Sequence, residues 1–322
     1  MHVHPRIAAL RTDREPQRRA QAAMEAARAD WRERDCPPGL ADDFAAYGEG
    51  RDLGKCPVLA ALFEKTGAAE ALLAGLSHRF CAAIRANPVG HPPFRHGFDG
   101  HTASLLLARS GRAQLMLQSR EPGTCEISAH VFSDAVRHDA IVAGEATGAL
   151  VEMTERPGRT VGLSERPVYL VAGDRQFADL SRQALALCRI ERRLVMLRLV
   201  RSAEKPGPVR EYDAADGSLR QCSAGQIATS RQEAIVTLLA RMGRGDAASD
   251  IARVAVEDGD ISLRWQALRE VLALDTRTGF AALCDLAGRP TDPLAAQAGA
   301  LRAQLLETHP ALARLENAPC PA

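Results

Sequence analysis

The sequence predicts a multidomain α+β protein with an N-terminal helical pair, a central antiparallel β sandwich or barrel, and a C-terminal array of helix pairs. Three observations predict this class. Apolar residues recur with a helical period up to about residue 95, with a period of two over 96–225, and with a helical period again over 226–322. Short turn signals divide the central segment. Beyond residue 230 the pattern repeats at a fixed 33-residue offset.

Residues 1–36 form a polar segment rich in arginine, glutamate and alanine, with a helical stretch around 15–34. Its only large apolar side chains are Met24 and Trp31, which share one helix face. Two groups are too few to form a core, so a solvated helix or a loose tail is expected. Docking onto a partner is the alternative.

Residues 37–95 are expected to form a pair of helices. Pro57 suits the first turn of a helix, and Gly67 can end it. A second helix carries one apolar stripe and stops at Asn87-Pro88. That stripe consists of Leu72, Leu73, Leu76, Phe80, Ala83 and Ile84.

Residues 96–225 contain short strand candidates separated by turns. Arg109–Arg112 and Asp216-Gly217 indicate hairpin turns, and Glu191–Arg193 indicates a further tight turn. Many short strands at such intervals predict an antiparallel sandwich or barrel. The remaining strand candidates are 125–132, 140–143, 149–153, 168–171, 184–190 and 194–200.

Residues 226–322 show internal repetition. Ala234-Ile235 returns 33 residues later as Ala267-Leu268, and after the same interval as Ala300-Leu301. One short helix pair cannot bury its apolar stripe, whereas stacked pairs give every stripe a neighbour. The sequence therefore predicts a stacked helical array.

Two stretches resemble known families. Asp260 before 264–268, and Asp292-Pro293 before Ala300-Leu301, resemble the first helix of HEAT-like repeats over about 230–310. This resemblance implies a binding or scaffold module. The strand density and the segment 167–174 resemble a cupin-like barrel. The HxH metal motif of that family is missing, so the resemblance implies no metal chemistry.

Composition excludes several classes of function. With 41 basic and 40 acidic residues, the chain lacks the positive charge of a general nucleic-acid binder. No apolar run reaches the about 18 residues of a membrane span. The eight cysteines form no CxxC pair, and the start shows no secretory signal, so a cytoplasmic location with reduced thiols is expected. Lysine occurs at only three positions, which is typical of GC-rich bacteria.

Four histidines are the candidates for a metal or ligand site. His96 and His101 lie in a loop rich in proline and glycine, and His130 and His138 flank a strand end. Imidazole nitrogens bind zinc and iron, so a metal centre is one hypothesis. The alternative is an ordered linker whose rings pack or cap. No cofactor is predicted, and iron or zinc is the alternative.

No catalytic motif is present. The sequence contains no Gly-x-Ser-x-Gly elbow, no phosphate-binding Gly-x-x-x-x-Gly-Lys loop and no Gly-x-Gly-x-x-Gly. The leading hypothesis is a non-enzymatic interaction or regulatory protein that holds another protein on its helical array. Trp265, Arg264 and Arg269 are the predicted partner contacts. The alternative is a metal-dependent enzyme or small-molecule sensor with its site in the β domain.

Overall fold

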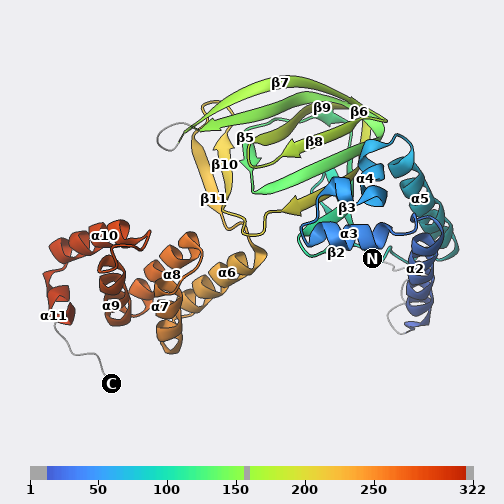
Figure 1. Cartoon of the computed structure of the whole chain (residues 1–322). Coiled ribbons are helices and arrows are strands. Elements are labelled where there is room, and N and C mark those ends of the chain that lie inside the picture. The colour runs from blue at the N-terminus through green and yellow to red at the C-terminus, as the bar shows by residue number, and fades with distance from the viewer. Residues whose placement is uncertain (1–12, 156–159, 317–322) are drawn as a thin grey trace, which may run out of the picture. The chain divides into compact units, whose positions relative to one another are not determined.

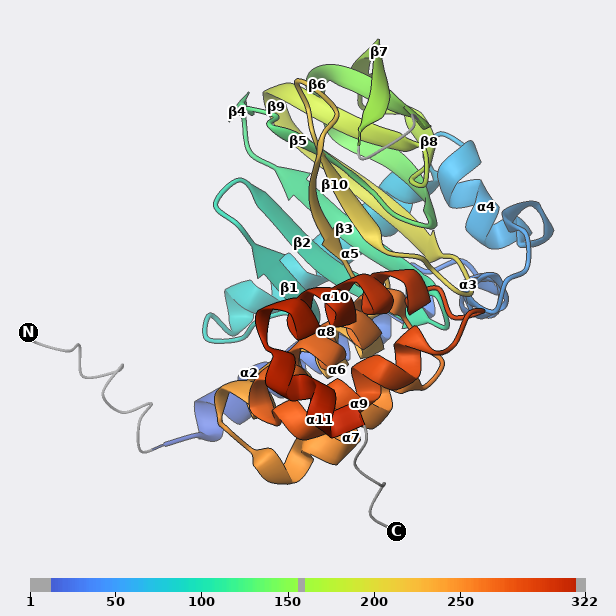
Figure 2. The ribbon, with the colours of Figure 1, turned by 90° about the vertical axis from the view of Figure 1, so that its left-hand side faces the viewer.

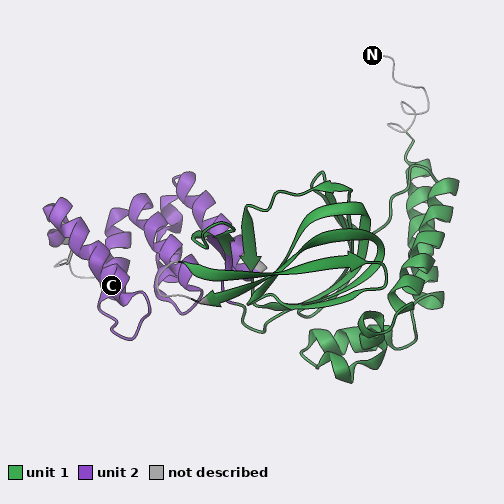
Figure 3. Ribbon diagram, turned by 90° about the horizontal axis from the view of Figure 1, so that it is seen from above, with its two compact units in different colours: residues 1–206, 211–220 green, residues 207–210, 221–322 purple. Residues whose placement is uncertain are grey.

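The chain folds into two compact units (Figure 3). A computed structural model describes residues 13–155 and 160–316. The first unit comprises 1–206 and 211–220, and the second comprises 207–210 and 221–322. Helices and antiparallel sheets both occur, so the predicted mixed class is confirmed (Figure 1). The N-terminal helices and the central strands share the first unit.

The first unit begins with helices. They are α2 (Glu15–Arg34), α3 (Leu40–Gly48), the short 3₁₀ helix η1 (Leu53–Lys55), α4 (Pro57–Glu64) and α5 (Ala68–Ala86). Gly67 precedes α5 with φ of 91°, a left-handed conformation that glycine adopts without strain. Its N–H donates to the Glu70 carboxylate at 2.9 Å. The two helices predicted within 37–95 correspond to α4 and α5.

Helix α2 is an integral part of the core, contrary to the expectation of a solvated helix. Met24 is 0% exposed and Trp31 is 4% exposed. The Trp31 indole Nε1 donates to the Leu72 carbonyl of α5 at 3.1 Å. Ala20 and Ala27 are also buried, because small side chains let α2 approach its neighbours closely. Residues 1–12 of the predicted tail lie outside the described residues.

The strands form two antiparallel sheets. The main sheet has the order β1-β2-β3-β9-β6-β7, with β4 paired to β9 and β8 paired to β6, and the small sheet has the order β11-β10-β5. Figure 2 shows β1, β2 and β3 side by side. The bounds are β1 Arg95–Phe98, β2 Thr102–Ser110, β3 Ala113–Arg120, β4 Gly123–Thr124, β5 Ala129–Phe132, β6 Ala135–Glu155, β7 Val161–Val171, β8 Arg175–Asp179, β9 Gln183–Ser202, β10 Val209–Asp213 and β11 Leu219–Ser223.

The hairpins predicted at Arg109–Arg112 and Asp216-Gly217 are confirmed, but the turn predicted at Glu191–Arg193 is wrong. There β9 runs on without interruption, paired along β6, which joins two strands predicted to be separate. The pairing of β6 with β9 contains a bulge at this point, because the register shifts on either side of Glu145. Gly144 has φ of 96°, and a Cβ on it would lie 2.2 Å from the Arg193 carbonyl oxygen. The charged residues Glu191–Arg193 therefore lie in a largely exposed part of β9 and do not form a turn.

The main sheet separates two apolar cores. On one face Leu115, Leu197 and Leu199 are buried in a cluster that includes helix residues such as Leu59 and Leu72. Ile141, Leu194 and Met196 belong to a second cluster. The face that carries this second cluster is called the inner face below. A third cluster joins Phe132 of β5 and Tyr212 of β10, whose ring centroids lie 6.0 Å apart.

The second unit contains the first residues of β10 and the last residues of β11, and its remaining elements are helices. They are α6 (Ile227–Arg241), η2 (Gly245–Ala247), α7 (Ala248–Val256), α8 (Ile261–Leu274), α9 (Thr276–Ala287), α10 (Ala295–Thr308), η3 (Pro310–Leu312) and α11 (Ala313–Glu316). Leu268, Val271 and Leu283 are fully buried in their common core. Asp260 caps α8 by accepting hydrogen bonds from the N–H groups of Ser262 and Leu263.

Three hydrogen bonds in the second unit join residues separated by the 33-residue offset of the sequence. Gln266 Nε2 reaches the Glu233 carbonyl at 3.5 Å, Thr237 Oγ1 pairs with Glu270, and Arg289 Nη1 donates to the Val256 carbonyl at 2.6 Å. Each bond joins residues 33 apart. Among the described residues, none of the helices has the length and apolar character to cross a bilayer.

Candidate functional site

The loop histidines lie at an edge of the main sheet. His96 lies on β1, where its Nδ1 is 3.3 Å from the Phe94 carbonyl oxygen. His101 lies in the turn to β2, and its backbone N–H donates to the Asp99 carboxylate at 3.0 Å. Hydrogen bonds from the backbone N–H groups of Thr102 and His101 lower the pKa of Asp99. Asp99 thus stabilises the turn.

His138 packs among aromatic rings on the helix-covered face. Its ring centroid lies 6.1 Å from that of Phe63 in α4 and 5.0 Å from that of Phe177 in β8. Burial lowers its pKa, so the ring is neutral at pH 7. The ring is therefore partly buried between two aromatic side chains.

His130 lies on β5 and lines a cavity of about 400 Å³. The residue is 4% exposed, and its Nε2 is buried without a hydrogen-bond partner. Burial lowers its pKa, while Glu165 acts in the opposite direction. Glu165 of β7 and Cys188 of β9 also line the cavity, and the Cys188 thiol donates to the Thr147 carbonyl at 3.4 Å. The rest of the wall consists of Ile127, Gly148, Ala149, Pro167, Ala186 and Ala214.

The small residues of this wall follow from a strand irregularity. The β6–β9 register shifts between Thr147 and Gly148. A Cβ on Gly148 would lie 2.1 Å from the Ala186 carbonyl oxygen, so the backbones meet there as only glycine permits. The cavity therefore combines apolar walls with one carboxylate and one unpartnered imidazole nitrogen, and its size is within the usual range for small-molecule sites.

The four histidines do not meet. They occupy an edge strand, a turn, the region around β5 and the helix-covered face of β6. Within residues 13–155 and 160–316, no group of three or more His, Cys, Asp or Glu side chains is arranged to hold a metal ion. The sequence places histidines near one another along the chain, but only sheet register decides which of them share a face.

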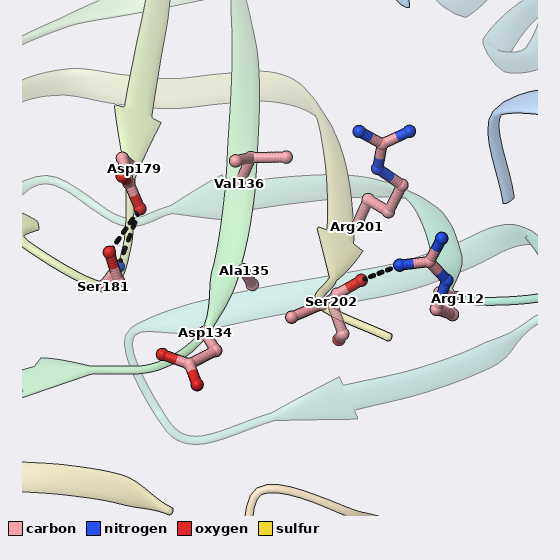
Figure 4. A pocket seen from close by; sticks show the side chains of 9 residues that line it. Arg112, Asp134, Ala135, Val136, Asp179, Ser181, Arg201 and Ser202 are labelled. Atoms are coloured by element: carbon pink, nitrogen blue, oxygen red, sulfur yellow. Dashed lines mark hydrogen bonds between the residues drawn. The ribbon is translucent and has the colours of Figure 1, made fainter. Parts of the chain in front are cut away.

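A smaller pocket of about 300 Å³ lies at the ends of β6, β8 and β9 (Figure 4). Its polar side chains largely bond to the protein itself. Arg112 Nη1 donates to the Ser202 carbonyl at 3.2 Å, and Asp179 accepts from the Ser181 hydroxyl at 2.7 Å. Arg201 donates to the Arg51 carbonyl at 2.7 Å. These bonds fix strand ends and connect β9 to the helices, so this pocket has a structural explanation.

The second unit carries a groove of about 820 Å³ between α8 and the C-terminal helices. Trp265, Arg269 and Leu272 contribute one wall from α8, with Ala273 and Thr276 at its end. The opposite wall consists of Leu301, Leu305, His309, Ala311 and Leu312. The groove is therefore mainly apolar, and its charged or titratable side chains are Arg269 and His309.

Two of the three predicted partner contacts line this groove, and Arg264 does not. Arg264 is 3% exposed. Its Nε donates to the Ala255 carbonyl at 3.1 Å, and its Nη2 pairs with the Asp292 carboxylate. The predicted role of Arg264 as a partner contact is therefore replaced by a structural one, because its donors link successive helix pairs. Leu301 and Leu305, which were not predicted as partner contacts, line the groove instead.

No protein-family model and no curated protein sequence matches the chain. Several solved structures are similar to part of it. The 7S globulin of Momordica charantia is 14% identical over 38% of this chain and 36% of its own, with a TM-score of 0.28. A cupin superfamily protein from Desulfitobacterium hafniense is 18% identical over 33% and 83%, with a TM-score of 0.25. An RmlC-like cupin from Shewanella frigidimarina is 14% identical over 35% and 87%, with a TM-score of 0.26.

Cupins thus occur among the similar structures. The matched part spans about a third of the globulin. At these identities and TM-scores the likenesses assign neither a ligand nor an activity to this chain.

Proposed function

We propose that the protein is a non-enzymatic interaction protein whose HEAT-like helical unit holds a partner segment in the groove between α8 and α10. The observation that carries the proposal is the groove itself, about 820 Å³ lined by Trp265 and several leucines. Such a volume accepts the apolar side chains from one face of a short helix. The occupant is therefore an amphipathic segment of another protein.

Trp265 supplies the anchor. It is half-buried on α8 and presents part of its ring to the groove. Tryptophan at the centre of an apolar groove is a frequent hot spot, because it buries a large area and loses little side-chain entropy. Trp265 is therefore expected to contribute more than any leucine of the groove.

Charge specifies the partner further. Arg269 is exposed on the groove wall, and His309 lies on the opposite wall. Among the described residues that line the groove, none is acidic. A partner segment with acidic residues beside its apolar face is favoured, and a basic one is disfavoured.

Tryptophan fluorescence of the intact chain tests the proposal. The probe is a synthetic amphipathic helix with leucines three and four positions apart and flanking glutamates, and the comparison peptide carries lysines instead. The protein has two tryptophans, and Trp31 is buried in the first unit, so a change in emission reports on Trp265. Saturable binding of the acidic peptide and weaker binding of the basic one are expected.

Variants locate the binding. Trp265→Ala is expected to weaken binding about thirty-fold, corresponding to about 2 kcal/mol, and is followed by peptide anisotropy. Arg269→Glu is expected to weaken the acidic peptide about tenfold. The matched control is Arg277→Glu, an exposed α9 position outside the groove. Equal affinity of Arg269→Glu and Arg277→Glu for the acidic peptide would contradict binding in the groove.

A second candidate function is small-molecule binding in the cavity of His130, favoured by the buried, unpartnered Nε2. Neutral imidazole accepts a hydrogen bond through one nitrogen, and Glu165 supplies a negative charge at the wall. Alanine, isoleucine and proline side chains line the remainder. A small organic amine with an apolar body satisfies all three features.

Thiol alkylation tests this candidate. Butylamine is expected to slow the reaction of Cys188 with iodoacetamide, while Cys81, exposed on α5, reacts at an unchanged rate. Glu165→Gln is expected to abolish the protection, and Glu152→Gln, an exposed carboxylate on β6, to leave it intact. Protection that persists in Glu165→Gln would contradict an amine site.

A further inference from the structure

The inner face of the main sheet carries an unusual concentration of polar side chains. Register pairs Gln118 of β3 with Met196 of β9, and Arg198 of β9 with Asp139 of β6. Directly paired residues of antiparallel strands project to the same face, as do residues two apart on one strand. Arg120 and Arg137 therefore share the inner face with this set. The set, Gln118, Arg120, Arg137, Asp139 and Arg198, is called the arginine cluster.

One carboxylate neutralises the cluster in part. Asp139 is 1% exposed and accepts from Arg198 Nε at 2.7 Å and Arg198 Nη2 at 3.0 Å. Arg137 Nε lies 3.0 Å from the same carboxylate. Two guanidinium groups thus share one buried aspartate, while the Arg120 side chain has neither an ion pair nor a hydrogen bond within the described part of the chain.

The charges do not balance even when neighbouring groups are included. Asp99 is within electrostatic range of Arg120, but its carboxylate already accepts the backbone hydrogen bonds of the turn. The Cys125 thiol is the other titratable neighbour named for Arg120. Three guanidinium groups then face two carboxylates at most. An excess positive charge remains in a partly buried place.

Two buried polar atoms of the cluster lack partners. They are Arg120 Nε, a donor, and Gln118 Oε1, an acceptor. Burial of such atoms without hydrogen bonds is unfavourable, so native structures satisfy them with protein, water or a ligand. Burial and the repulsion of Arg198 lower the pKa of Arg120. Burial outweighs the attraction of Asp139 and lowers the pKa of Arg137 to about 10, so the group stays protonated at pH 7.

We propose that the arginine cluster binds a small oxyanion, the chemistry shared by carboxylates and phosphates, with Arg120 as its principal contact. The planar guanidinium group presents paired N–H donors that match the oxygens of either anion. The anion supplies the negative charge that the protein does not, and it gives Arg120 Nε an acceptor. A hydroxyl or water donor held beside the anion satisfies Gln118 Oε1.

The test uses the intact protein with phosphate, acetate and lactate as probes in low-chloride buffer. We expect at least one probe to bind saturably by calorimetry and to raise the melting temperature. Arg120→Met is expected to weaken that binding at least tenfold, and Arg120→Lys to weaken it less, because the charge remains. Arg109→Met is the matched control, since Arg109 is an exposed arginine on β2.

The melting temperature without anion separates ligand binding from a structural role. If Arg120 serves binding, Arg120→Met removes an unpaired, partly buried charge and leaves this temperature unchanged or raised. A lowered melting temperature together with unchanged anion affinity would overturn the proposal, as would the absence of binding by all three probes. The outcome is independent of peptide binding to the helical unit, because the cluster lies wholly in the first unit.

Discussion

The two units differ in where their charged and apolar side chains lie. In the first unit, three guanidinium groups and a carboxylate gather on the inner face of the main sheet, and apolar cores lie on both faces of that sheet. In the second unit, the main buried ion pair joins neighbouring helix pairs, and apolar residues line an open groove. A chain with 41 basic and 40 acidic residues therefore contains two surfaces of different chemistry. The overall charge predicts neither surface.

The largest expected effect concerns the core of the first unit. Trp31→Ala removes a fully enclosed indole and its hydrogen bond to Leu72, and is expected to cost about 3–5 kcal/mol in the free energy of unfolding. Urea unfolding followed by circular dichroism measures it. Glu33→Ala, an exposed change in the same helix, is the control. An effect of Trp31→Ala no larger than that of Glu33→Ala would show that α2 is peripheral, as the sequence alone suggested.

The second unit is tested through its buried ion pair. Arg264→Ala leaves the Asp292 carboxylate, whose side chain is 9% exposed, without its guanidinium partner. Loss of one partner of a buried pair is expected to cost about 3 kcal/mol. The double variant Arg264→Met, Asp292→Leu is expected to recover much of the loss. Hydrogen exchange should show faster exchange in α8 and α10 of Arg264→Ala, and in the first unit no change.

The same pair gives the second unit a pH dependence. Hydrogen bonds from Arg264 and the Leu294 N–H lower the pKa of Asp292 in the folded state. The unfolded state therefore binds a proton more readily, and stability falls as pH drops below the ordinary carboxyl pKa of about 4. The loss should be smaller in the double variant. Melting temperatures between pH 3 and pH 7 measure this loss of stability. Equal pH slopes for the unmodified protein and the double variant would contradict the assignment of the pH dependence to Asp292.

A smaller pH effect is expected in the first unit at higher pH. Burial lowers the pKa of both His130 and His138. The unfolded chain takes up these protons first, so stability is full above about pH 6.5 and declines as pH falls below it. His138→Gln is expected to flatten this part of the curve. An unchanged slope would mean that His138 is as accessible to protons in the folded state as in the unfolded chain.

Local patterns predicted the elements that local chemistry determines. Pro57 begins α4, and the hairpin at Asp216-Gly217 forms because Gly217 adopts φ of 70°. The interruption predicted at Glu191–Arg193 failed because charged side chains also occur on exposed parts of long strands. Helix α2 was misjudged because half of its buried stripe is alanine, which counts as apolar only when a neighbour lies close.

The sites depend on tertiary structure and were predicted only in part. Trp265 and Arg269 lie four apart on one helix face, and the sequence identified both. Arg264, adjacent in sequence, points into the array instead, and only its distant partner Asp292 explains this. The arginine cluster is set by the register of three strands between Gln118 and Arg198, which no local pattern specifies. Sequence spacing likewise could not show that His130 lines one cavity of the first unit while His96 lines another.

Hydrogen exchange of the intact chain with the acidic amphipathic peptide tests the central claim most directly. The account predicts slower exchange in 261–276 and 295–312, the two walls of the groove, and unchanged exchange in 95–202. Trp265→Ala should remove this protection at the same peptide concentration. Protection confined to the β strands, or none in the groove walls at a peptide concentration that saturates the fluorescence change, would contradict a docking groove in the helical unit.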